Sequence, residues 1–239
     1  MEGVPPGPEV IRLIREQSDT VMLAFSSGKD AVAAWLAMRD HRPAFKRIVP
    51  FYLYAVPGLE FIEKSLRYYE AFFGTRIIRM PQPWLYNALA SNVYQPPCHR
   101  PIIKAARMAG VTREDVRRAI REDEGLPEDT WYASGVRASD SPIRRVHFKK
   151  HGAMVESSRV FYPVWDLRKD GLVDSLRESG VKMSADYRLF GRSFDGIDYR
   201  FLKPIHDHFP NDYRRILEFF PMAGLEIKRA EWAREASRG

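Results

Sequence analysis

The sequence predicts an α/β protein with a mainly parallel sheet of about five strands, flanking helices and a helical C-terminal extension. Two observations support this. Apolar runs of strand length alternate with stretches whose apolar residues recur at helical spacing. The 239 residues, of which 45% are hydrophobic, are enough for one large domain with a substantial core. Strands separated by single helices imply βαβ units, which pair their strands in parallel.

The early elements follow from these runs. Gly74 is expected to end a helix that carries Phe61, Leu66 and Tyr69 at helical spacing. Pro50 lies inside an apolar run and indicates an interruption or an edge strand. The expected elements are, in order, a helix over 9–17, a strand over 20–25, a helix over 30–40, a strand over 47–54, a helix over 60–73 and a strand over 75–80.

The remaining elements are shorter. Thr112 followed by Asp115 resembles a capping box and predicts the start of a charged helix. From about residue 168, short helices and turns predict an extension packed on the same domain. The further expected elements are a helix over 102–108, a helix over 112–125, a fourth strand over 130–134 and a fifth over 159–162. The expected division is a lead-in with a short helix over 1–17, an α/β domain over 18–166 and the extension over 167–239.

The most informative segment is the loop Ser26-Ser27-Gly28-Lys29-Asp30, between the first strand and the next helix. Free backbone N–H groups and the helix dipole make such a helix start a binding site for phosphate. The small residues allow close approach, and Lys29 adds a mobile positive charge. A Walker loop ending at Lys29 would need glycine at position 23 and Ser or Thr at position 30, where this chain has Leu23 and Asp30.

Composition limits the classes of partner. A net charge of +7 favours anionic partners such as nucleotides or nucleic acid. The apolar runs are too short to span a membrane, and the N-terminus lacks the pattern of a secretory signal. The single cysteine, Cys98, excludes an intramolecular disulfide and a self-contained iron–sulfur cluster, so we expect a reducing, cytoplasmic setting.

Four segments together resemble the PP-loop ATP pyrophosphatase superfamily, and within it the phosphoadenosine-phosphosulfate (PAPS) reductase-like proteins, which include phage members. The family patterns are S-G-G-K-D-S, T-G-x-E-F, G-x-R-x-x-E-S and P-x-x-D-W. The matching segments here are Ser26–Ala31, Pro57–Phe61, Gly135–Ser141 and Pro163–Asp166. Ser27, Ala31 and the inverted Trp165-Asp166 depart from those patterns.

The resemblance implies a HUP-type, Rossmann-like sheet, as in adenine nucleotide alpha-hydrolases, that holds ATP with Mg²⁺ across its strand ends. It implies an enzyme that cleaves or transfers at the α-phosphate, an ATP pyrophosphatase or adenylyltransferase. The implied catalytic residues are Lys29, Asp30 and Arg137, and the implied nucleotide-binding residues are Ser26, Ser27, Gly28, Lys29, Asp30, Gly135, Arg137 and Ser141. Asp166 is expected to cap the helix that follows it, and Glu60 is expected to cap or orient the helix over 60–73.

The tail lacks the cysteine that sulfonucleotide reductases use, so reductase activity and an iron–sulfur cluster are not expected. Two alternatives stay open: a sulfur-transfer component of nucleic-acid modification, and a non-catalytic nucleic-acid-binding or structural protein. The metal ligands, the oligomeric state and the acceptor are not readable from the sequence. For an anionic acceptor the candidate residues are Cys98, His99, Arg100, Lys104, Lys149 and Lys150.

Positive charge also gathers between Arg144 and His151. Like charges repel, and the segment has few apolar anchors, so we expect a mobile flap that orders when an anion binds. His206 and His208 have an H-x-H spacing without a convincing third ligand, and a structural role is expected for them.

Overall fold

A six-stranded sheet is the framework of the computed structural model, which describes residues 3–237. Its strands are β1 (Thr20–Ala24), β2 (Arg47–Tyr54), β3 (Ile78–Pro81), β4 (Tyr132–Ser134), β5 (Met154–Val155) and β6 (Val160–Phe161). Their order is β3-β2-β1-β4-β6-β5. The strand β1 pairs in parallel with β2 and β4, and β4 pairs in parallel with β6. This order, with the first strand in the middle, is that of Rossmann-like sheets and confirms the predicted fold class.

Two details of the sheet differ from the expectation. The strand β5, which has two residues and no clear sequence signal, was not predicted; it pairs with β6 in the antiparallel sense. Pro50 lies in an inner strand, opposite Leu23 of β1, and neither interrupts nor edges the sheet. The expected interruption at Pro50 was therefore wrong.

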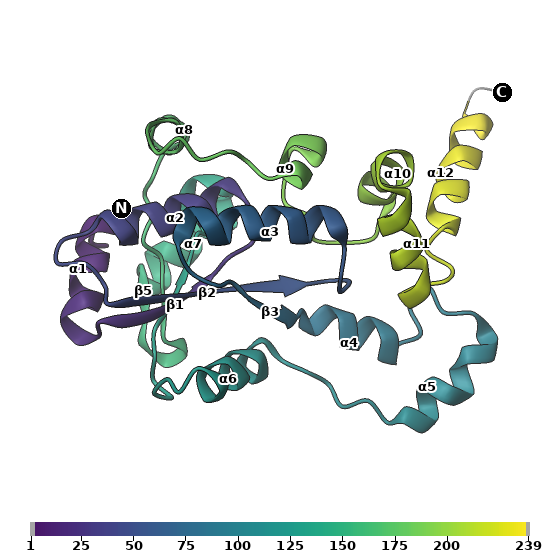
Figure 1. The fold of residues 1–239 in the computed structure, drawn as a ribbon, viewed down its shortest axis with the longest axis horizontal. Helices are drawn as coiled ribbons and strands as arrows, with labels where there is room; N and C mark the ends of the chain where they lie inside the picture. The colour runs from purple at the N-terminus through teal and green to yellow at the C-terminus, as the bar shows by residue number, and fades with distance from the viewer. Residues whose placement is uncertain (1–2, 238–239) are drawn as a thin grey trace. The chain divides into compact units, whose positions relative to one another are not determined.

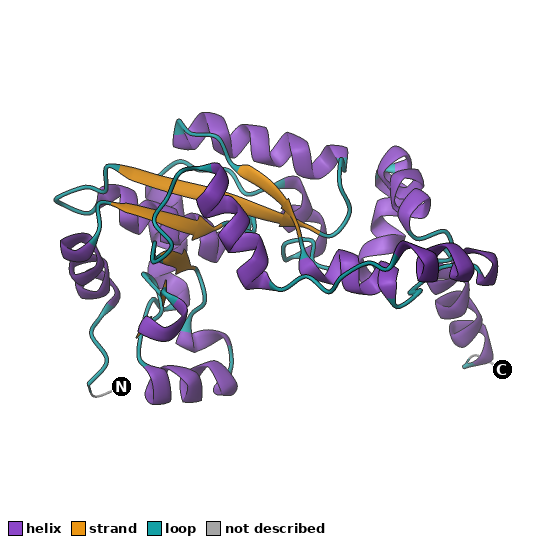
Figure 2. Ribbon diagram, turned by 90° about the horizontal axis from the view of Figure 1, so that it is seen from below, coloured by secondary structure: helices purple, strands orange, loops and turns teal. Residues whose placement is uncertain are grey.

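Helices connect and cover the strands, and Figure 1 shows α2 on one side of β1 and β2 and α6 on the other. They are α1 (Gly7–Gln17), α2 (Lys29–Asp40), α3 (Glu60–Phe73), α4 (Pro83–Ala90), α5 (Arg100–Ala106), α6 (Arg113–Asp123), α7 (Pro142–His151), α8 (Lys169–Glu178), α9 (Ala185–Phe190), α10 (Tyr199–His208), α11 (Pro210–Phe219) and α12 (Leu225–Ala236), with short 3₁₀ turns η1 (Pro97–His99), η2 (Ala138–Asp140) and η3 (Glu156–Ser158). Figure 2 shows the strands in orange and the helices in purple.

The chain forms two compact units, each made from separate stretches of sequence. Unit 1 consists of residues 1–52, 69–79 and 118–183, and unit 2 of residues 53–68, 80–117 and 184–239. The long elements β2 and α3 begin in one unit and continue into the other.

Unit 1 has an aromatic and aliphatic core around β1. Val21, Met22 and Leu23 are completely buried, and the Phe25 ring packs edge-on against Tyr69 at a centroid distance of 5.0 Å. Trp35 of α2 stacks on Phe73 at 4.0 Å. The helix α8 also packs on α2. These contacts fix the position at which α2 begins, directly after β1.

Unit 2 has its own core, centred on Phe61. That ring stacks on Phe209 at a centroid distance of 5.0 Å and meets Phe194 edge-on at 5.8 Å. Phe201 and Phe220 are almost fully buried in the same unit. None of the described helices is both long enough and apolar enough to cross a membrane.

Candidate anion-binding site

The segment Ser26–Lys29 turns the chain from β1 into α2. The N–H of Phe25 still donates to Phe51 at 2.8 Å, so strand pairing continues to the edge of the turn. Ser26 is exposed and Ser27 is buried with φ of 57°, in the left-handed region. Glycine adopts this conformation most freely. Ser27 therefore adopts a conformation that glycine would adopt without strain.

The start of α2 has no side-chain cap. Gly28 is the N-cap residue. The first backbone N–H groups of a helix have no partner within the helix, and the dipole places partial positive charge there. Helix starts of this kind commonly bind phosphate in proteins.

The side chains of Lys29 and Asp30 form an ion pair on the first turn of α2. Lys29 Nζ lies 2.7 Å from Asp30 Oδ2, and both side chains keep about a quarter of their surface exposed (28% and 27%). On its other oxygen, Asp30 Oδ1 lies 2.7 Å from Arg137 Nε. The Asp30 carboxylate thus joins the helix start to the segment that follows β4.

Gly135 brings these segments into direct contact. A Cβ atom at Gly135 would lie 2.6 Å from the backbone carbon and oxygen of Asp30 and 2.8 Å from the nitrogen of Ala31. No real side chain tolerates such distances to backbone atoms. Glycine is required here because the end of β4 touches the first turn of α2.

Arg137 is buried at 4% exposure, and its Nε lies at ion-pair distance from Asp30 without a hydrogen bond. Besides Asp30, its Nη2 lies 2.8 Å from Asp140 Oδ1, and its Nη1 donates to the carbonyl of Leu167 at 3.2 Å. In this arrangement the guanidinium binds protein groups on every side. The predicted contact of Arg137 with a phosphate stays a prediction.

Asp140 continues this row of charges to α7. Its Oδ2 lies 2.5 Å from Arg144 Nη1, while the Ser141 hydroxyl accepts from the Arg144 N–H at 3.2 Å and caps α7. The alternating series Lys29, Asp30, Arg137, Asp140 and Arg144, which we call the charge row, runs from the anion-binding turn to the first turn of α7.

The segment expected to be a mobile flap is instead the regular helix α7. Ser141 caps it, Pro142 lies in its first turn, and Phe148 is completely buried against Tyr162 and Trp165 at centroid distances of 5.0 and 5.3 Å. The flap expectation was wrong because Phe148 alone is a sufficient anchor. Burial lowers the pKa of His147, and His151 lowers it further, so His147 is neutral at pH 7.

The predicted acceptor residues fall into separate places. Lys149 and Lys150 lie in the last turn of α7, in unit 1. Cys98, His99, Arg100 and Lys104 lie in η1 and α5 of unit 2, where Cys98 is exposed and α5 contains no buried residue. The side chain of His99 contacts Gln95, with Nδ1 3.1 Å from Oε1.

Two predicted caps differ from the expectation. Asp166 accepts from the N–H of Gly7 at 3.2 Å, at the start of α1, while Arg168 is the N-cap residue of α8. Glu60 caps nothing: its own N–H donates to Asp212 at 2.6 Å, and the N–H of Phe61 donates to the same carboxylate at 3.2 Å. By contrast, the predicted capping box of Thr112 and Asp115 is confirmed by reciprocal bonds of 2.9 and 3.1 Å.

Sequence reasoning missed Asp140 and Asp212. Asp140 lies three positions after Arg137, a spacing that a turn or helix brings together, so the sequence did contain that signal. Asp212 lies 152 positions from Glu60, and no local pattern joins them. Burial raises the pKa of Asp212, the two donated N–H bonds act in the opposite direction, and Glu60 raises it further.

The described residues contain no cluster of three metal-ligating side chains. Asp30 is the carboxylate nearest the anion-binding turn in sequence, and it is paired with Lys29 and Arg137. The described side chains near this turn therefore do not form a resident Mg²⁺ site. Mg²⁺ commonly binds through substrate phosphates, so it would enter here as part of the substrate MgATP.

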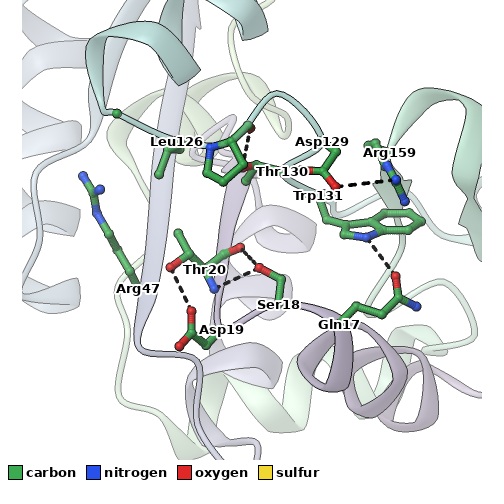
Figure 3. Close-up of a pocket in the computed structure, with 12 residues that line it drawn as sticks. Gln17, Ser18, Asp19, Thr20, Arg47, Leu126, Asp129, Thr130, Trp131 and Arg159 are labelled. Carbon is green, nitrogen blue, oxygen red and sulfur yellow. Dashed lines mark hydrogen bonds and ion pairs between the residues drawn. The ribbon is translucent and has the colours of Figure 1, made fainter.

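A separate hollow of about 470 Å³ lies at the opposite ends of the strands in unit 1. It lies beside Thr20 and Arg47, which begin β1 and β2. Figure 3 shows the Arg159 guanidinium over the Trp131 ring, 5.2 Å from its centroid, and the Trp131 Nε1–H donating to Gln17 at 3.2 Å. Its charged side chains are paired with protein partners, Arg47 with Glu124 and Arg159 with Glu156 and Asp129.

Comparison with known proteins gives distant likenesses. No family model matches the chain, and no curated protein matches it significantly. Among solved structures, a U34-tRNA thiolase NcsA from Methanococcus maripaludis, with its [4Fe-4S] cluster, aligns at a TM-score of 0.47 and 12% identity over 90% of this chain and 78% of that one. An NH3-dependent NAD synthetase from Campylobacter jejuni, in complex with nitrate, aligns at a TM-score of 0.44 and 15% identity. That alignment covers 93% of this chain and 92% of the synthetase chain. Likenesses of this size assign no function.

Proposed function

We propose that the chain binds ATP with its phosphates at the Ser26–Lys29 turn, and that it cleaves or transfers at the α-phosphate. The observation that carries the proposal is the uncapped start of α2 after a left-handed Ser27, with Lys29 on the same turn. The PAPS reductase-like sequence pattern supports ATP as the particular anion, because Ser26–Asp30 retains the lysine and aspartate of that pattern.

The chemistry follows from charge placement. Backbone N–H groups of the turn hold the β- and γ-phosphates, and Lys29 leaves Asp30 to meet them. An acceptor oxygen forms a bond to the α-phosphorus, the bond from that phosphorus to the bridging oxygen breaks, and pyrophosphate leaves. The acceptor's proton passes to solvent. Mg²⁺ carried by ATP offsets charge on the departing pyrophosphate.

Asp30 has a positioning role in this proposal. It is held by Arg137 at 2.7 Å and releases Lys29 when phosphate arrives, because the phosphate competes for the lysine. The Arg137 contact then keeps the first turn of α2 in place. The buried Arg137 guanidinium thus stabilises the turn through Asp30 and does not itself contact the phosphate.

The first prediction concerns Lys29. Lys29→Ala should weaken MgATP binding by about tenfold or more, because a charged hydrogen bond to phosphate is lost, which corresponds to about 1.5–3 kcal/mol. Calorimetric titration with ATP and with a non-hydrolysable analogue measures it. Lys46→Ala is the control, because Lys46 pairs with Asp19 at the other ends of the strands and is 77% exposed. Equal ATP affinity in wild type and Lys29→Ala would exclude the proposed site.

Turnover is tested separately by pyrophosphate release. Binding without release would favour the non-catalytic alternative on the same fold. Release that needs an added nucleic acid or sulfur donor would identify the acceptor class.

A further inference from the structure

The helix α7 has an exposed face that the proposed function does not use. Phe148 anchors the buried side, and Ile143, Val146 and Lys150 lie on the opposite side at spacings of three and four residues. Ile143 is 81% exposed and Val146 is 63% exposed. Arg145 and Lys149, four positions apart and both exposed, share a stripe of the helix between these residues and the side of Phe148. These five residues are called the α7 basic face.

The charge of this face is uncompensated. The helix Pro142–His151 contains no acidic residue. Across residues 3–237, Arg145, Lys149 and Lys150 make no ion pair, whereas Arg144 is paired with Asp140. Cations in the last turn stabilise the helix dipole, which accounts for Lys149 and Lys150. Arg145, in the middle of the helix, and the exposed Ile143 and Val146 are not explained in that way.

We propose that the α7 basic face docks the phosphate backbone of a nucleic acid. Arg145 and Lys149 are separated by about 6 Å along the helix axis, a spacing that suits neighbouring phosphates of one strand. A continuous polyanion satisfies a row of cations that has no negative charge between them. Acidic protein surfaces mix both signs, and this helix offers no anion to pair with their cations.

The charge row connects this face to the anion-binding turn. Asp140 binds both Arg137 and Arg144, at 2.8 and 2.5 Å, so the first turn of α7 is tied to Asp30 through two residues. A strand held on α7 would thus lie on an element attached to the proposed ATP site. The assignment of nucleic acid as the acceptor rests on the proposed function, while the docking itself does not.

The test is fluorescence anisotropy with labelled single-stranded RNA and DNA of about 20 nucleotides, at several salt concentrations. The combined variant Arg145→Ala, Lys149→Ala, Lys150→Ala should weaken binding about tenfold or more at low salt. It should reduce the slope of log affinity against log salt by about 2 to 3, since each phosphate contact contributes about 0.7–0.9. The variant retains Ser141 and Phe148, which hold the helix.

The matched control is the combined variant Arg39→Ala, Lys46→Ala, Arg76→Ala. It removes three exposed cations of unit 1, so the net charge changes equally. The proposal is overturned if the control weakens binding as much, if wild type binds neither RNA nor DNA at low salt, or if a poly-glutamate peptide binds as tightly as the oligonucleotides.

Calorimetry with ATP on the α7 variant separates the two proposals. Unchanged ATP affinity with lost oligonucleotide binding supports the docking face and leaves the ATP site intact. Oligonucleotide binding that depends on α7, in a protein with no ATP affinity, would refute the proposed function and retain the docking face.

Discussion

Gly135 is the residue with the least freedom in the candidate site. A methyl group there would lie 2.6 Å from backbone atoms of Asp30, so the end of β4 and the first turn of α2 would have to separate. Backbone atoms cannot rotate out of the way as a flexible side chain can. The glycine in the Gly-x-Arg pattern is therefore needed for packing against the first turn of α2, whatever else it contacts.

We expect Gly135→Ala to reduce the free energy of unfolding by about 1–3 kcal/mol, the usual cost of overpacking, and to abolish MgATP binding. Urea denaturation and calorimetry measure these effects. Gly196→Ala is the control, because no atom lies within 4 Å of a Cβ built there and its φ is not in the positive range. A Gly135→Ala protein with wild-type stability and ATP affinity would contradict the packing.

For Arg137, the sequence predicted the location of the residue but not the contacts of its side chain. The pattern located the residue at the end of β4, beside the loop that follows β1, and the structure places it there. The pattern could not show that the side chain is enclosed by Asp30, Asp140 and the carbonyl of Leu167. The Leu167 carbonyl belongs to a distant part of the chain, and only the tertiary fold brings it near.

At the scale of elements, the errors of prediction included α7, β5 and the missed helix α4. Repulsion between like charges suggested a loop over residues 144–151, yet a hydroxyl cap and one buried phenylalanine are enough for a helix. Tertiary packing commonly provides most of the stability of a short helix. The strand β5 is held by its pairing with β6 and has no independent sequence signal.

The helix α3 depends on Asp212, which lies in α11 and is 2% exposed. Its carboxylate accepts the N–H groups of Glu60 and Phe61 and interacts favourably with the positive end of the helix dipole. Replacing Asp212 by alanine should lower the free energy of unfolding by about 0.5–2 kcal/mol. Chemical denaturation at fixed pH measures it.

The pH dependence of this cap has a definite sign. Burial raises the folded-state pKa of Asp212 above its unfolded value of about 3.9, so the folded protein binds more protons as the group titrates. Its contribution to stability should therefore fall as the pH rises from about 4 through the folded pKa. The difference in stability between wild type and Asp212→Asn should shrink over that range, and a difference that grows would contradict the raised pKa. Burial also raises the pKa of Asp186, but this residue is present in both proteins, so its effect on stability cancels in the difference.

At the scale of the whole molecule, the sequence predicted the sheet but not how distant stretches combine. The alternation of strands and helices predicted a mainly parallel sheet, because parallel strands need crossover connections, but it did not predict the strand order. The grouping of residues 184–239 with 53–68 and 80–117 rests on contacts such as Arg215 to the carbonyl of Pro57, at 3.1 Å. Contacts of that kind leave no periodic signal in either segment.

Cys98 allows a test across the two units. It belongs to unit 2 and is exposed, while the anion-binding turn belongs to unit 1. We expect Cys98→Ser to retain pyrophosphate release within about twofold, because adenylyl transfer needs no thiol nucleophile. Release is measured with a coupled phosphate assay. Loss of release in a folded Cys98→Ser protein, with ATP affinity retained, would favour the sulfur-transfer alternative.

The two long-range caps also bear on how the chain is made. Asp166 completes the start of α1 from 159 positions away, and Asp212 completes the start of α3 from 152 positions away. During synthesis both helices leave the ribosome long before the carboxylates that finish them. Contacts of such separation form late and slow the search for the native state. A nascent chain would therefore hold these two helix ends open until most of the protein has been translated.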